Sequence, residues 1–143
     1  MDGPSADPKL DLLRRVPLFA GLEPTVLEAI AAIAEERKVP EGTQLTHEGR
    51  HEGYFFVIVS GSVRIERGGQ LLNTLRDGDF LGEISLIDGG PRTATATAES
   101  ACDLLVMTYP RFRQLLDSAS EVRGAIFQAV GQRLRSLDED APV

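Results

Sequence analysis

The sequence predicts a mainly β fold: an antiparallel, jelly-roll-like β-roll with helices at both ends. Between residues 42 and 80, short apolar or alternating runs are separated by glycine-bearing turns, which is the spacing of an antiparallel all-β fold. Apolar residues recur at helical spacing before residue 40 and again after residue 108. With 143 residues and 42% hydrophobic content, the chain is long enough for one domain with a buried core.

Two helices are expected ahead of the strands. Apolar residues within 10–13 fit a short first helix, and residues 1–9 are predicted to form a mobile tail. The second helix is expected to begin at Pro24, because the missing N–H of proline costs little in a first turn, and to end before Pro40. Its apolar stripe, which should face the core, consists of Val26, Leu27, Ile30, Ile33 and Ala34.

The hydrophobic period then changes from that of a helix to that of a strand. Thr and Ala alternate strictly over residues 93–98, so this run is expected to be a strand with Thr on one face and Ala on the other. The aromatic run 54–56 is predicted to pack in the core and at its rim. Cys102, the single cysteine, excludes an internal disulfide and is expected to be buried. The other strands are expected at about residues 44–46, 54–59, 62–66, 71–75 and 102–107.

Two more helices are expected after the last strand. Thr108 is predicted to cap the first of them, whose apolar residues are Phe112, Leu115 and Leu116. The last helix, at about residues 121–137, has one apolar stripe, but Gly124 and Gly131 lower the stability of its interior. An acidic tail at residues 138–143 follows it.

Charge and composition restrict the kinds of partner. The formal net charge of −7, from 15 basic and 22 acidic residues, argues against a nucleic acid and against an anionic membrane as partner. No apolar run approaches the ~18 residues of a membrane span, and the chain does not open with a signal-peptide pattern. A cytoplasmic protein whose single domain spans residues 10–137 is therefore expected.

The stretch over residues 79–98 is the part of the chain that predicts a ligand. Gly82 permits close approach of the backbone, and residues 83–87 are long enough for one helical turn, whose free N–H groups attract an anion. Arg92 follows a Gly-Gly-Pro turn and can hold two phosphate oxygens with its planar guanidinium. Because Glu83 would repel a phosphate alone, the ligand is expected also to present hydroxyls, such as a ribose 2′-OH.

The run Phe-Leu-Gly-Glu-Ile-Ser-Leu at residues 80–86, followed by Pro-Arg-Thr-Ala at residues 91–94, resembles the phosphate-binding cassette of the cyclic nucleotide-binding domain family. The resemblance extends from about Leu12 to Leu137. It implies a β-roll that binds cAMP or cGMP and needs no other cofactor. It also implies that the Gly82 and Glu83 backbone and the Arg92 side chain bind the cyclic phosphate, while the Glu83 side chain binds the 2′-OH. The predicted ligand-binding set is Leu81, Gly82, Glu83, Ile84, Ser85, Arg92, Thr93 and Arg133.

Two members of this set raise questions that the sequence leaves open. Thr93 accompanies guanine in some relatives and adenine in many bacterial ones, so cAMP is preferred here without cGMP being excluded. Strict alternation also places Arg92 and Thr93 on opposite faces, so both can reach a ligand only if the chain still bends at Arg92. By resemblance to bacterial activators, Arg133 contacts the base or Glu83, and the alternative is that it is a solvated surface residue.

Catalysis and a metal site are not expected. Glu83 has no second acid within the motif, and Ser85 has no nearby histidine that could activate it. His47 and His51 lie four residues apart in a glycine-rich loop, which does not supply the ligand set of a metal-binding barrel. These histidines are predicted to belong to a solvated loop.

The sequence thus predicts a sensor or regulatory module that binds a cyclic mononucleotide and signals through rearrangement of its C-terminal helix. The unidentified receiver of the signal is an effector protein, or a second copy of the chain in a homodimer formed through that helix. One rival hypothesis is a ligand-free interaction module, in which Glu83 and Arg92 form only a surface ion pair. Another is the sensor fragment of a larger transcription factor or channel.

Overall fold

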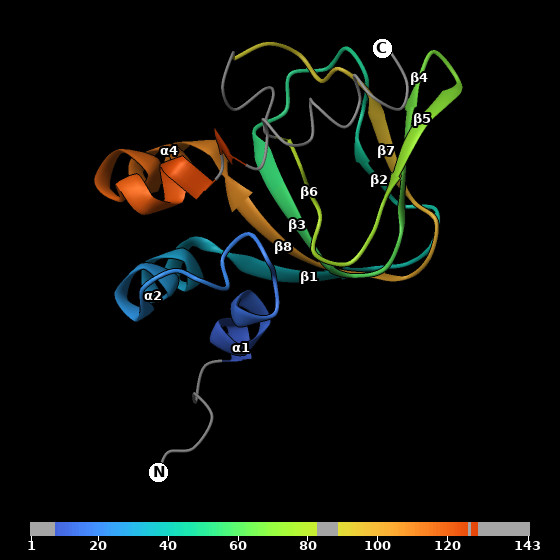
Figure 1. Cartoon of the computed structure of the whole chain (residues 1–143). Coiled ribbons are helices and arrows are strands. Elements are labelled where there is room, and N and C mark those ends of the chain that lie inside the picture. The colour runs from blue at the N-terminus through green and yellow to red at the C-terminus, as the bar shows by residue number, and fades with distance from the viewer. Residues whose placement is uncertain (1–7, 83–88, 126, 129–143) are drawn as a thin grey trace.

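The computed structural model describes residues 8–82, 89–125 and 127–128. Within them, two four-stranded antiparallel sheets form a β-roll, and the helices gather at one side of it (Figure 1). The elements are α1 (Pro8–Arg14), α2 (Pro24–Ile33), β1 (Glu35–Val39), β2 (Gln44–Thr46), β3 (Tyr54–Ser60), β4 (Val63–Arg67), β5 (Gln70–Leu75), β6 (Phe80–Leu81), β7 (Thr95–Ala98), β8 (Cys102–Thr108) and α4 (Tyr109–Ser118).

Strand β3 lies at the centre of the fold because both of its faces are buried. It pairs with β8 and β6 in the sheet β1-β8-β3-β6, which faces the second sheet, β2-β7-β4-β5. Phe55 and Val57 belong to the core shared with the helices, whereas Phe56 and Ile58 belong to the core between the sheets. The predicted packing of the aromatic run is confirmed, with Tyr54 at the rim and 44% exposed.

The helices cover the outer face of the sheet that contains β3. Leu13 of α1 and Ile30 of α2 are fully buried there. Phe112 of α4 stacks on Phe55, with ring centroids 4.6 Å apart and planes inclined by 17°. This stack fixes the position of α4 against the strand that follows the loop at residues 47–53.

The second helix is shorter than predicted, and two strands were missed, β1 and the two-residue β6. Helix α2 begins at Pro24 as expected but ends at Ile33, and β1 begins at Glu35. The sequence of β1, Glu-Glu-Arg-Lys-Val, is charged and almost wholly exposed, so it lacks the alternation of a half-buried strand. It becomes a strand by pairing with β8, where Glu35 lies opposite Val106 and Val39 opposite Cys102.

The other predicted elements of the described segments are confirmed with small shifts of their ends. The alternating run forms β7 only from Thr95, and Ala96, Thr97 and Ala98 are all buried there. Cys102 is buried at the start of β8, as expected. Thr108 occupies the N-cap position of α4, but its side chain makes no capping hydrogen bond.

Parts of the expected C-terminal region lie outside the described residues. Residues 120–125 are helical, which agrees with the start of the predicted last helix. Most of that helix, the tail at residues 138–143 and most of the tail at residues 1–9 are not described. Across the segments that the structure describes, no helix has the length and apolar character needed to cross a membrane.

Candidate functional site

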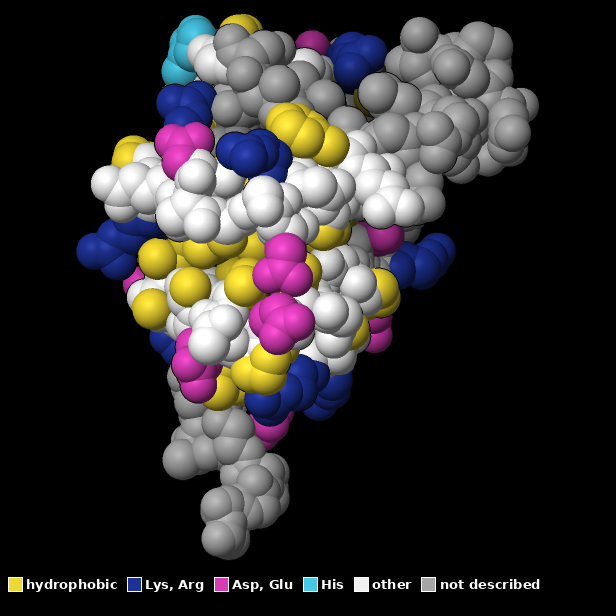
Figure 2. Space-filling view, turned by 60° about the vertical axis from the view of Figure 1, so that its left-hand side comes forward, with side chains coloured by type: hydrophobic (Ala, Val, Ile, Leu, Met, Phe, Trp, Pro, Cys, Tyr) yellow, Lys and Arg dark blue, Asp and Glu magenta, His cyan; other side chains and the backbone are white. Residues whose placement is uncertain are grey.

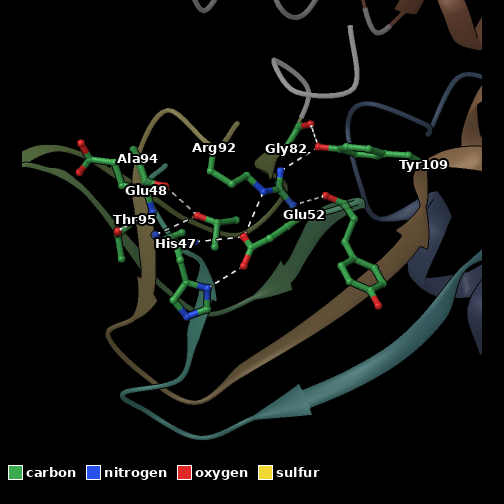
Figure 3. Close-up of polar contacts among 11 residues, drawn as sticks. His47, Glu48, Glu52, Gly82, Arg92, Ala94, Thr95 and Tyr109 are labelled. Carbon is green, nitrogen blue, oxygen red and sulfur yellow. Dashed lines mark hydrogen bonds and ion pairs between the residues drawn. The ribbon is translucent and has the colours of Figure 1, made fainter. Parts of the chain in front are cut away.

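Arg92 is the charged residue of the predicted site that the structure describes, and protein groups hold its side chain from three directions. It precedes β7, and the residue is only 4% exposed. Its Nη1 donates to the Tyr109 hydroxyl at 2.8 Å, its Nη2 to the Tyr54 carbonyl at 2.7 Å and its Nε to Glu52 Oε1 at 3.3 Å (Figure 3). Each nitrogen of the guanidinium thus has one protein acceptor, which fixes the plane of the group.

The backbone of Arg92 is fixed as well. Its N–H donates to the Arg50 carbonyl at 2.8 Å, and its carbonyl accepts from the Gly49 N–H at 2.9 Å. Both partners belong to the loop at residues 47–53, which joins β2 to β3. These two bonds fix the backbone from which the Arg92 side chain extends. Arg92 precedes the run in which the strand alternation was predicted.

Gly82 lies against Arg92 because it has no side chain. Its φ is +100°, and a Cβ there would lie 2.6 Å from the Tyr54 carbonyl oxygen and 2.9 Å from Arg92 Nη1. Both the conformation and the space require glycine. The Tyr109 hydroxyl, which accepts from Arg92, donates to the Gly82 carbonyl oxygen. Tyr109 therefore joins the glycine and the arginine of the predicted cassette to the first turn of α4.

Glu52 lies between His47 and Arg92 (Figure 3). Its Oε2 is 2.7 Å from His47 Nδ1, and its Oε1 accepts from the His47 backbone N–H at 3.1 Å. Partial burial alone would raise the pKa of Glu52, but the hydrogen bonds from His47 and the charges of His47 and Arg92 outweigh burial and lower this pKa. Glu52 is therefore an ionised carboxylate at neutral pH and partly neutralises the guanidinium.

Four of the predicted ligand-binding residues are described, and the structure brings two of them together. Gly82 and Arg92 are in contact, and Leu81 is buried in β6 opposite Phe56. Thr93 is exposed while Arg92 is buried, so the two residues differ in their access to solvent. The remaining four, Glu83, Ile84, Ser85 and Arg133, lie outside the described residues.

The sequence did not identify Glu52, Tyr54 or Tyr109 as parts of the site. Both histidines lie in the predicted loop, but the sequence did not predict that the His47 ring, whose side chain is 32% exposed, is hydrogen-bonded to Glu52. His51 is exposed. Among the described residues, no group of His, Cys, Asp and Glu could hold a metal ion.

Comparison with known proteins identifies the family. A model described as the cyclic nucleotide-binding domain matches residues 36–119, which is more than half of the chain. The chain belongs to the cyclic nucleotide-binding domain family. This is a family of regulatory binding domains and not of enzymes, and the predicted recognition, fold class and non-catalytic role are confirmed.

Three relatives show what kinds of protein this chain is similar to. A CRP-like cAMP-activated global transcriptional regulator of Mycobacterium tuberculosis is 28% identical over 91% of this chain and 60% of its own length. A cyclic nucleotide-gated potassium channel of Mesorhizobium japonicum is 35% identical over 78% of this chain and 31% of its own. The solved regulatory domain of Toxoplasma gondii PKA with cAMP is 25% identical, covers 98% of this chain and 56% of that one, and has a TM-score of 0.71.

The chain thus spans less than two thirds of each of these relatives. One of these relatives is a transcriptional regulator. The expectation that no nucleic acid is a partner rests on the net charge of these 143 residues, and it does not extend to a longer protein that contains them. On the face that Figure 2 shows, Lys and Arg side chains are interspersed with Asp and Glu. Among the described residues on that face, the basic side chains do not form the single-sign field that binding to a phosphate backbone uses.

Proposed function

We propose that this chain is a sensor module that binds one cyclic nucleotide, cAMP, with the phosphate held at Gly82 and Arg92. The observation that carries the proposal is the fixed guanidinium of Arg92. Each terminal nitrogen has two N–H bonds, and one on each is accepted by Tyr109 or Tyr54. No described residue accepts the second N–H of either nitrogen, so two donors in one plane are left for phosphate oxygens.

Local charge supports an anionic ligand at this position. The chain has a formal net charge of −7, so long-range attraction does not favour a phosphate. A guanidinium whose side chain is only 3% exposed, beside a glycine that lets the backbone approach closely, provides attraction over a short range. The ligand-free alternative, an Arg92–Glu83 surface ion pair, does not account for the burial of Arg92.

The choice of cAMP rests on the relatives. The Mycobacterium regulator is cAMP-activated, and the Toxoplasma regulatory domain was solved with cAMP. Thr93, the residue that left the choice open, is exposed. Preference for cAMP over cGMP is therefore part of the proposal. A cytoplasmic location is proposed as well.

The proposed signal leaves through the C-terminal helices. Tyr109, the first residue of α4, bonds both Gly82 and Arg92, and its backbone N–H donates to the Gly53 carbonyl at 2.9 Å. A ligand that moves Arg92 therefore acts on the first turn of α4 and on the chain that follows it. An effector protein, or a second copy of this chain, would read the resulting position of the last helix.

Hydrogen exchange with and without saturating cAMP tests both parts of this proposal. Amides of the cassette, residues 80–92, should become more protected because the ligand covers them. Amides of residues 126–137 should become several-fold more protected, since Gly131 lowers the stability of the helix that the sequence predicts there. Protection in the cassette without any change at residues 126–137 would show that the signal leaves by another route. No change in either segment would contradict ligand binding itself.

A further inference from the structure

His47, Glu52 and Arg92 form a chain of three ionisable groups that ends at the proposed phosphate position. The His47 ring is 2.7 Å from Glu52 Oε2, and Arg92 Nε is 3.3 Å from Glu52 Oε1. The side chains become less exposed in that order, at 32%, 20% and 3%. The histidine is thus the member that water reaches most easily, and the arginine is the one that would meet the ligand.

Glu52 has two opposing effects on an anion that binds to Arg92. Its contact with Nε orients the guanidinium, which favours binding. Its negative charge lies beside the same guanidinium and repels a phosphate, which disfavours binding. Protonation of His47 adds a positive charge in contact with the carboxylate and so cancels much of the repulsion, while both hydrogen bonds to Glu52 stay possible.

We propose that His47 and Glu52 are positioning residues that control, through Arg92, how strongly the site holds an anionic phosphate, so that nucleotide affinity rises as His47 takes up a proton. The inference rests on the proposed function, since it concerns the same phosphate position. His47 does not touch the nucleotide in this account. It acts only through the charge that Glu52 presents to Arg92.

The other charged groups around this loop do not replace His47 in that role. Glu48 is turned toward the hairpin between β4 and β5, where its Oε1 accepts from the Gly68 N–H at 2.9 Å. Arg50 and His51 are exposed, and no described residue bonds their side chains. Other charged or titratable residues next to the loop are Arg67 of β4, which donates to the Thr93 carbonyl, Tyr54 of β3, whose carbonyl accepts from Arg92, and Tyr109 of α4.

The sign of the pH effect follows from linkage. An imidazole is the side chain that can take up a proton close to neutral pH, whereas a cyclic phosphodiester stays singly negative over that range. A bound anion favours the protonated imidazole, so binding takes up protons and affinity rises as pH falls. With the two charges separated by Glu52 in a partly solvated site, the rise between about pH 8 and pH 5.5 should be about threefold to tenfold.

Calorimetric titration of cAMP across this pH range tests the proposal in the wild type and three variants. The wild type should show the rise in affinity, together with proton uptake in buffers of different ionisation enthalpy. His47→Asn can still donate to Glu52 but cannot take up a proton, so its affinity should stay at the wild-type high-pH value. Glu52→Gln can still accept from Arg92, so its affinity should be higher at high pH and independent of pH. His51→Asn is the matched control and should keep the wild-type slope.

Two results would overturn the proposal while leaving nucleotide binding intact. One is wild-type affinity that does not change with pH. The other is a pH slope that persists unchanged in His47→Asn or in Glu52→Gln. Absence of binding at every pH would be a different result, since it would overturn the proposed function and this inference together. Circular dichroism of each variant at both ends of the range confirms that the measured protein is folded.

Discussion

Replacing Arg92 with leucine is expected to weaken cAMP binding by about thirtyfold to a thousandfold. The substitution removes a charge-assisted contact to a full negative charge, which is worth about 2–4 kcal/mol in a poorly solvated site. It also leaves the carboxylate of Glu52 beside the phosphate without its cationic partner, which adds repulsion. Displacement of a fluorescent cAMP analogue, measured well below the unfolding temperature, gives the affinity ratio.

Arg50→Leu provides the matched control for that measurement. Arg50 lies in the loop that holds the Arg92 backbone, and its side chain is exposed. The substitution Arg50→Leu removes the same charge from the protein as Arg92→Leu does. Its affinity for cAMP should stay within about twofold of the wild type, because an exposed charge is screened by water and salt. Similar losses in Arg50→Leu and Arg92→Leu would mean that net charge, and not the contact at Arg92, determines binding.

Replacing Gly82 with alanine should lower the free energy of unfolding by about 2–4 kcal/mol. The new Cβ would lie 2.6 Å from the Tyr54 carbonyl oxygen and 2.9 Å from Arg92 Nη1, and the φ of +100° is unfavourable for any side chain. The backbone carbonyl cannot move without disturbing the pairing of β3 with β8, in which Tyr54 lies opposite Thr108. Chemical denaturation followed by circular dichroism measures the loss.

Gly49→Ala separates the two causes of that loss. Gly49 also has a positive φ, +83°, but a Cβ there would meet nothing within 4 Å. This variant should lose only the conformational part, about 1 kcal/mol. If Gly82→Ala lost no more than Gly49→Ala, the close approach of Gly82 to Arg92 would not be a constraint on the folded protein.

The sequence contained enough local information to predict the roll, since strand and helix periods and glycine turns are local features. It missed β1 because the residues of that strand are charged and exposed, and only pairing with β8 makes them a strand. Similarly, the N-cap residue Thr108 was placed correctly, yet its hydroxyl makes no capping bond. A local pattern predicts where an element begins more reliably than which atoms satisfy its ends.

The site was predictable only in part, for a similar reason. Gly82 and Arg92 stand within one short motif, so their types and spacing could be interpreted together. The groups that hold Arg92 are distant in sequence, since Glu52 is separated from it by 40 positions, Tyr54 by 38 and Tyr109 by 17. Their contribution follows from the pairing of strands and the packing of α4, which no local pattern of those residues specifies.

Calorimetric titration of cAMP into the purified wild-type chain at neutral pH tests the central claim most directly, because it measures affinity and stoichiometry together. The account predicts saturable binding of one cAMP per chain, with weaker binding of cGMP. The same titration into Arg92→Leu should give an affinity at least about thirtyfold lower. Absence of binding heat with either nucleotide at millimolar concentration and at two temperatures, or equal affinities in the wild type and Arg92→Leu, would contradict the account.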